Sequence, residues 1–235
     1  KTMNMFLAKT LGEQLYDTLI KDDRYKYYIE GFFNTILTSL GAIIVGLILG
    51  LLIALVLYVN KKFGRLKILK AICDTYIYII RGTPVVLQLM IMYFVVLVFI
   101  PNGIIVAIIT FGLNSAAYVA ELFRGGLEAV DHGQLEAGLS LGLNAKQTMA
   151  KIIVPQGFKT SLPALCNEFI ALVKETSVMG YIAILDITFA AYKIQSRTLD
   201  AFVPLIISAI IYLLLITILT LILRKVERRL ARGQR

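Results

Sequence analysis

Three ionisable side chains lie within long apolar stretches of the sequence: Arg81, Glu121 and Glu168. A charge near the middle of a membrane helix costs about 2.5–3.5 kcal/mol to insert, so such residues generally face a bundle interior or a wet cavity. An arginine holds a carboxylate through two parallel hydrogen bonds, and a glutamate accepts from an ammonium group. The three residues therefore have the chemistry to bind a molecule that carries both a carboxylate and an ammonium group, or else they pair with one another and only hold helices in register.

Helical spacing places these residues on polar faces of three predicted helices. The second apolar segment carries Asp74, Tyr78, Arg81 and Gln88, which are spaced at i, i+4, i+7 and i+14. The third carries Asn114, Tyr118 and Glu121, and the fourth carries Ser161, Ala164, Glu168, Ala171 and Glu175. Residues that recur at this interval share one side of a helix, although Gly82 and Pro84 are expected to distort the first stripe locally.

Composition indicates that the elements carrying these residues are membrane helices. Of 235 residues 58% are hydrophobic and 17% are charged, and the mean hydropathy is +0.80, which excludes an ordinary water-soluble domain. The net charge of +9 comes from basic residues that gather at 61–70 and 224–235, between and after apolar segments. This is the distribution of a membrane protein and does not require nucleic acid. The two cysteines are predicted to be buried thiols.

The apolar segments predict an all-α membrane protein with five transmembrane helices. They lie at 31–60, 71–100, 103–120, the later part of 152–190, and 201–223. Gly46 and Gly50 in the first span form a pair typical of tight helix packing. With both basic clusters in the cytoplasm, the N-terminus lies outside and the C-terminus inside. We expect residues 1–30 to form an extracytoplasmic amphipathic segment, 31–228 the membrane domain, and 229–235 a basic tail.

The loop at 131–155 carries a specific motif. Its first part is predicted to form a short helix over 131–141, which Gly142 ends by tolerating positive φ. The spacing of Glu136-Ala137-Gly138, Gly142, Ile152, Val154 and Pro155 resembles the E-A-A-x3-G-x9-I-x-L-P motif of the permease subunits of bacterial ABC importers. Two positions depart from the motif, Gly138 for its second alanine and Val154 for its leucine, and both keep a small or aliphatic side chain.

A second group of segments is similar to the polar amino-acid uptake permeases within that family. The stretch 81–89 resembles their R-G-T-P-x-x-x-Q-L segment, and 114–121 and 174–177 resemble segments of their third and fourth spans. The resemblance covers about residues 30–228 and implies the type I importer permease fold. With the polar faces, it suggests a substrate-binding set of Arg81, Thr83, Gln88, Asn114, Tyr118, Glu121 and Glu168.

The resemblance also implies partners. In that family the 131–142 segment is a coupling helix that seats in an ATPase subunit, and the matching positions are His132, Leu135, Glu136, Ala137, Gly138, Leu139 and Gly142. The sequence contains no Gly-Lys pair, so the phosphate-binding loop, ATP and Mg²⁺ are expected on separate ATPase subunits and no cofactor is expected here. The implied assembly lies in the bacterial cytoplasmic membrane. It contains two ATPase subunits, an extracytoplasmic binding protein and a second permease subunit, which we expect to be a second copy of this chain.

The substrate and two other classes of function stay open at this point. Two acids against one arginine favour Arg, Lys or His, although Lys159 and Lys174 on the same span can neutralise the excess; a neutral or acidic amino acid such as Gln or Glu is the alternative. An ion-driven secondary transporter also places charges in mid-membrane but does not need the coupling motif. A membrane enzyme is disfavoured because the chain has a single histidine and no H-E-x-x-H sequence.

Overall fold

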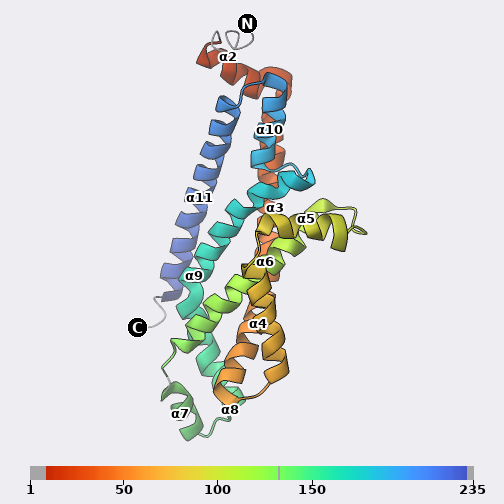
Figure 1. Ribbon diagram of the computed structural model, residues 1–235. Coiled ribbons are helices and arrows are strands. Elements are labelled where there is room, and N and C mark those ends of the chain that lie inside the picture. Colours follow the sequence, from red (N-terminus) through yellow and green to blue (C-terminus); the bar gives the residue numbers. More distant parts are fainter. Residues whose placement is uncertain (1–8, 132, 232–235) are drawn as a thin grey trace.

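A computed structural model describes residues 9–131 and 133–231, and within those ranges every regular element is a helix. The helices are α2 (Leu11–Leu15), α3 (Tyr25–Phe63), α4 (Lys67–Arg81), α5 (Val85–Ile91), α6 (Gly103–Glu128), α7 (Gly133–Ser140), α8 (Ala145–Thr148), α9 (Val154–Glu175), α10 (Ile187–Thr198) and α11 (Phe202–Ala231). Wide helical turns follow α2 (Tyr16–Ile20), α5 (Met92–Val96) and α8 (Met149–Ile153), and 3₁₀ turns cover Lys21–Asp23 and Thr176–Ile182. The elongated bundle has α2 at one end and α7 and α8 at the other (Figure 1).

The centre of the bundle is the layer α3–α6–α9, in which α6 packs against both neighbours. Small residues let α3 and α6 approach closely, as the Gly46 and Gly50 pair predicted. A Cβ atom on Gly50 would lie 2.6 Å from Cγ1 of Val119, and one on Gly46 would lie 3.0 Å from Cβ of Ser115. Without a strong hydrophobic force between helices in lipid, such close backbone contact is what holds them together.

Three helices are long and apolar enough to cross a membrane: Tyr25–Phe63, Gly103–Glu128, and Phe202–Glu227 of α11. The pair α4 and Val85–Val96 passes the same test jointly but is bent by 106°, as a broken span or a re-entrant loop would be. The charged helix α9 is not among these candidates. Three of the five predicted spans are therefore confirmed by length and composition, a fourth if the bent pair is one span, and the span within 152–190 stays a prediction.

The bend between α4 and α5 corrects the prediction of one continuous polar stripe from Asp74 to Gln88. Gly82 ends α4, and Pro84 precedes the first residue of α5. Proline has no N–H with which to continue a helix, and it pushes the preceding residue, Thr83, out of the helical region. The distortion expected at these residues is thus a full change of direction, which separates Gln88 from the face that carries Arg81.

The segment between α6 and α9 is more helical than the sequence predicted. Before the loop, α6 ends at Glu128, and in its last turns Arg124 bonds to acids one turn before and after it. The short helix over 131–141 is present as α7, and Gly142 follows it at φ +83° as predicted. The chain is already helical from Ala145, and the wide turn that ends at Ile153 accommodates the missing N–H of Pro155.

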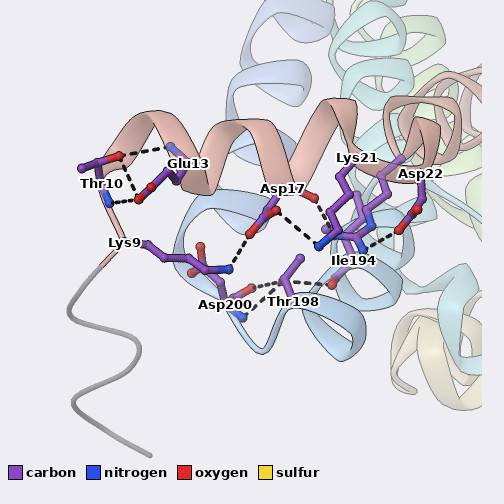
Figure 2. Close-up of polar contacts among 10 residues, drawn as sticks. Lys9, Thr10, Glu13, Asp17, Lys21, Asp22, Ile194, Thr198 and Asp200 are labelled. Carbon is purple, nitrogen blue, oxygen red and sulfur yellow. Dashed lines mark hydrogen bonds and ion pairs between the residues drawn. The ribbon is translucent and has the colours of Figure 1, made fainter.

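At the other end of the bundle, residues 9–24 form a collar beside the turn between α10 and α11 (Figure 1). Lys9 and Asp17 form an ion pair, and the Thr10 and Glu13 side chains cap α2 (Figure 2). Leu11 and Leu15 of the predicted apolar stripe are 62% and 39% exposed, so the protein itself does not cover them. Leu7 lies outside the described residues. Between the fourth and fifth predicted apolar segments, the stretch 191–200 is mostly the C-terminal part of α10.

Candidate functional site

Arg81, Tyr118 and Glu121 come together where the end of α4 lies against α6. The Cζ atom of Arg81 is 5.2 Å from the centroid of the Tyr118 ring, and its Nη1 is 3.9 Å from Oε2 of Glu121. The second distance is longer than a hydrogen bond, so Arg81 is attracted to Glu121 without being locked to it. The Arg81 side chain is 44% exposed and keeps hydrogen-bond donors for a further partner.

Arg81 and Glu121 border an open hollow of about 400 Å³ on the surface of the bundle. Its lining residues are Asp74, Ile77, Tyr78, Arg81, Gly82 and Glu121. The volume is within the range of small-molecule sites, and the lining combines an aromatic ring, aliphatic groups, a guanidinium and two carboxylates. Such a set can accept a molecule that carries both a carboxylate and an amine.

The acids beside the hollow are partly neutralised by other basic residues. Oε2 of Glu121 accepts a 2.7 Å hydrogen bond from Nη2 of Arg124, whose Nη1 donates to Glu128 at 2.9 Å. Lys61 pairs with Glu128 at 2.9 Å, and Lys70 pairs with Asp74. A chain of alternating charges thus runs from Arg81 toward the basic loop after α3. Among the described cations of this charge chain, Arg81 has the longest distance to an acid, 3.9 Å.

Thr83, Gln88 and Asn114 form a separate cluster at the bend. Nε2 of Gln88 donates to the carbonyl of Ile80 and to the Thr83 hydroxyl, each at 2.8 Å. Nδ2 of Asn114 donates to Oε1 of Gln88 at 3.0 Å. These bonds satisfy backbone and side-chain groups that the broken helix leaves unpaired. The three residues do not line the Arg81 hollow, and their visible role is to hold the bend against α6.

Glu168 lies apart from the hollow, at the contact between α9 and α6. Its Oε1 accepts a 2.8 Å hydrogen bond from the hydroxyl of Ser115, the residue that packs against Gly46. The structure therefore places the seven predicted binding residues in three groups: Arg81 with Tyr118 and Glu121, the bend cluster, and Glu168 with Ser115. Only Arg81 and Glu121 of the first group line the hollow, and Tyr118 lies behind Arg81 as the ring that its guanidinium contacts.

The helix α7 separates the predicted coupling residues into a packed side and a free side. Leu135 and Gly138 are buried, and a Cβ atom on Gly138 would lie 2.7 Å from the Thr148 hydroxyl oxygen. The free side and the turn after it expose Glu136, Ala137, Leu139 and Leu141, with Leu139 and Leu141 exposed by 46% and 81%. His132 lies outside the described residues. An apolar surface at the tip of a long bundle is suited to contact with another protein.

Four residues near these sites were not among those predicted to act. Asp74 and Tyr78 were assigned to the polar face of the second span but not to the binding set, although helical spacing already placed them beside Arg81. Arg124 was not singled out, although its positions three residues after Glu121 and four before Glu128 are a sequence signal for a helical ion-pair network. Ser115 had no distinguishing signal, because its bond to Glu168 joins two distant helices.

Comparison with known proteins identifies relatives of this chain. The family model for "Binding-protein-dependent transport system inner membrane component" matches residues 42–232. The arginine transport system permease protein ArtQ of Bacillus subtilis is 39% identical over 87% of this chain and 92% of its own length. A putative glutamine transport system permease protein GlnP of Rickettsia bellii is 36% identical over 92% of this chain and 99% of its own.

A solved structure extends the comparison to the fold. The structure of an amino acid ABC transporter with histidines matches with a TM-score of 0.78 and 37% identity, over 87% of this chain and 94% of that one. The sequence and the fold thus point to the same group of proteins. The chain belongs to the family of binding-protein-dependent transport system inner membrane components, as an ABC importer permease.

Proposed function

We propose that this chain forms the translocation path of an ATP-driven importer for a basic amino acid: arginine, lysine or histidine. Family membership supports the importer function. The substrate class is supported by the similarity to the arginine permease ArtQ and to the amino acid transporter structure that contains histidines. In this proposal five segments cross the membrane: α3, the bent pair α4–α5, α6, α9 continued by α10, and α11. The basic loop 61–70, α7 and the C-terminus face the cytoplasm, and the collar faces outward.

The observation that carries the proposal is the position of Arg81 at the hollow. Its guanidinium is half-exposed, stacked on Tyr118 and only loosely attracted to Glu121. A substrate carboxylate binds such a planar group through two parallel hydrogen bonds. The carboxylates of Glu121 and Asp74 lie on the same lining, where they attract the amine and a cationic side chain. A zwitterion with an additional positive charge complements this set.

The pairing of Glu121 with Arg124 favours a second candidate, a neutral polar amino acid such as glutamine. If Arg124 holds the Glu121 charge throughout transport, the lining has no excess of negative charge to attract a cationic side chain. The α-carboxylate of the substrate still requires Arg81 in both cases. The two candidate functions therefore require different roles of Glu121 and the same role of Arg81.

Energy enters through partner subunits in this proposal. ATP and Mg²⁺ bind to two separate ATPase subunits, which contact the free side of α7 through Leu139 and Leu141. Their closure moves α7, and the continuous helical path from α8 to α9 carries the movement to the membrane helices. A second copy of the chain completes the path, and an extracytoplasmic binding protein delivers the substrate. The chain itself performs no covalent chemistry.

The test is ATP hydrolysis by the complex in liposomes, with its ATPase and binding protein, scanned across single amino acids. Stimulation by arginine, lysine or histidine supports the basic substrate. Stimulation only by glutamine or another neutral amino acid supports the second candidate. An ATPase subunit that does not co-purify with the chain contradicts the role of α7.

A further inference from the structure

A groove at the start of α9 lies at the height of the cytoplasmic membrane boundary in the proposed orientation. Gly157 packs against α6, where a Cβ atom on Gly157 would lie 2.7 Å from Cδ2 of Leu127. The next residue of α6, Glu128, pairs with Lys61 at the beginning of the basic loop 61–70. The first turns of α9 are therefore level with the basic loop, where positive residues mark the cytoplasmic side.

The groove has a volume of about 530 Å³ and combines two lysines with an apolar wall. Its lining residues are Lys151, Ile152, Pro155, Gln156 and Lys159. Lys151 and Lys159 are exposed, and neither takes part in an ion pair in the parts of the chain that the structure describes. The Gln156 side chain is held by a hydrogen bond, since its Nε2 donates to Oε1 of Gln134 on α7 at 3.2 Å.

The two lysines are spaced to converge on one anion. They are eight residues apart, Lys151 in the wide turn and Lys159 in α9, so at most about 12 Å separates them along the axis at the rise of an α-helix, and both long side chains can reach an anion between them. The surface between them is made by Ile152 and Pro155. A ligand that fits has a compact negative group for the ammonium groups and an apolar part for the wall.

We infer that this groove binds the headgroup of an anionic phospholipid from the inner leaflet. The phosphate lies between the ammonium groups of Lys151 and Lys159, and the apolar part of the lipid next to the headgroup packs against Ile152 and Pro155. Long lysine side chains at helix ends extend to the interface in this way, and basic pockets on the cytoplasmic side take anionic headgroups. The inference rests on the proposed function only for the orientation of the chain. Because the groove adjoins α7 through Gln156 and Gln134, a bound lipid steadies the base of the coupling segment.

Lipid binding to the purified transporter complex tests the inference directly. The complex is titrated with phosphatidylglycerol, and with phosphatidylcholine as the neutral comparison, and bound lipid is counted by native mass spectrometry. Removing both charges, as Lys151→Gln with Lys159→Gln, is expected to weaken phosphatidylglycerol binding at least about tenfold, because both basic side chains attract the anionic headgroup. Phosphatidylcholine binding stays unchanged.

The matched control removes two other exposed lysines, as Lys62→Gln with Lys67→Gln, from the basic loop. It has the same change in net charge and is expected to retain the tight phosphatidylglycerol site. An equal loss of phosphatidylglycerol binding in both double variants would mean that the whole basic face attracts the lipid, and it would overturn the assignment of the groove as the lipid site. Unchanged lipid binding in the Lys151 and Lys159 variant also overturns it. Failure of the proposed function is separate, because it appears as absent amino-acid-stimulated ATP hydrolysis whether or not lipid binds.

Discussion

The guanidinium of Arg81 lies against the ring of Tyr118, with 5.2 Å between Cζ and the ring centroid. The contact joins the last residue of α4 to the middle of α6, just before the chain turns by 106°. A cation over an aromatic face gains about 0.5–2 kcal/mol and leaves the edge of the guanidinium free to donate. The same residue is thus positioned by one helix and available to a ligand.

Replacement of Arg81 is expected to weaken uptake of every amino acid, because all share the α-carboxylate. Arg81→Ala should lower uptake by about ten- to a hundredfold, the value of a hydrogen-bonded charged pair. Arg81→Lys keeps the charge but loses the two-pronged geometry, so it should recover only part of the activity. Initial uptake rates in liposomes measure both. Arg65→Ala, in the exposed basic loop, is the control, and equal activity of the Arg81 and Arg65 variants would make Arg81 structural.

Replacement of Glu121 separates the two substrate candidates. Glu121→Gln keeps the shape of the side chain and removes its charge, so cationic amino acids should lose about tenfold more uptake than neutral ones. Competition between labelled arginine and unlabelled glutamine gives this ratio in one assay. A similar loss for both substrates would mean that Arg124 already holds the Glu121 charge in the working transporter, and the neutral candidate would then lead.

Because α3 and α6 approach closely, we expect that adding a single methyl group at Gly50 lowers the stability of the protein. In Gly50→Ala the new Cβ meets Cγ1 of Val119 at 2.6 Å and the backbone oxygen of Ala116 at 2.8 Å, so the helices must separate. We expect a loss of about 1–3 kcal/mol in stability. Thermal unfolding in detergent measures it. Gly125→Ala in α6 is the matched control, because nothing lies within 4 Å of its added Cβ, and it should leave the melting temperature unchanged or raise it.

The two sides of α7 predict two different phenotypes. Leu141→Asp changes a side chain that is 81% exposed, so it should leave the permease folded but reduce co-purification of the ATPase. Leu135→Ala removes a buried side chain and should lower thermal stability by about 2–5 kcal/mol. Retention of the ATPase by Leu141→Asp would show that α7 is not the contact. Gly142→Trp, at a positive φ, adds strain at the same place and should also impair assembly.

The collar is expected to loosen in acid. The hydrogen bond from Lys9 holds the pKa of Asp17 below its ordinary value (Figure 2). Because the folded-state pKa is depressed, this stabilisation is present above the ordinary pKa of an aspartate, about 4, and is lost as the pH falls below it. Amide hydrogen exchange over residues 10–20, corrected for the intrinsic rate, should rise in that range. Asp17→Asn should exchange rapidly already at neutral pH, and a wild-type collar whose protection does not change in acid would contradict the role of this pair.

Much of the architecture was readable because its causes are local. The apolar runs behind α3, α6 and α11, the glycine pair at 46 and 50, and the φ of Gly142 follow from composition and from neighbours within a few turns. The short helix α7 was predicted from its own residues for the same reason. The polar face through Arg81 and the one through Tyr118 and Glu121 were also predicted correctly as far as each helix is regular.

The grouping of the polar residues was decided by tertiary contacts. A helical stripe places Gln88 with Arg81, but the bend at Gly82 and Pro84 turns Gln88 toward Ile80 and Asn114 instead. Glu168 was assigned with Glu121 to one binding set and is instead bonded to Ser115 across the α6–α9 contact. The sequence by itself therefore determined the membrane class, the main helices and the motifs that identify the family. Only the tertiary structure decided which charges share a site, because periodicity assigns a residue to a face of one helix and packing between helices chooses its partner.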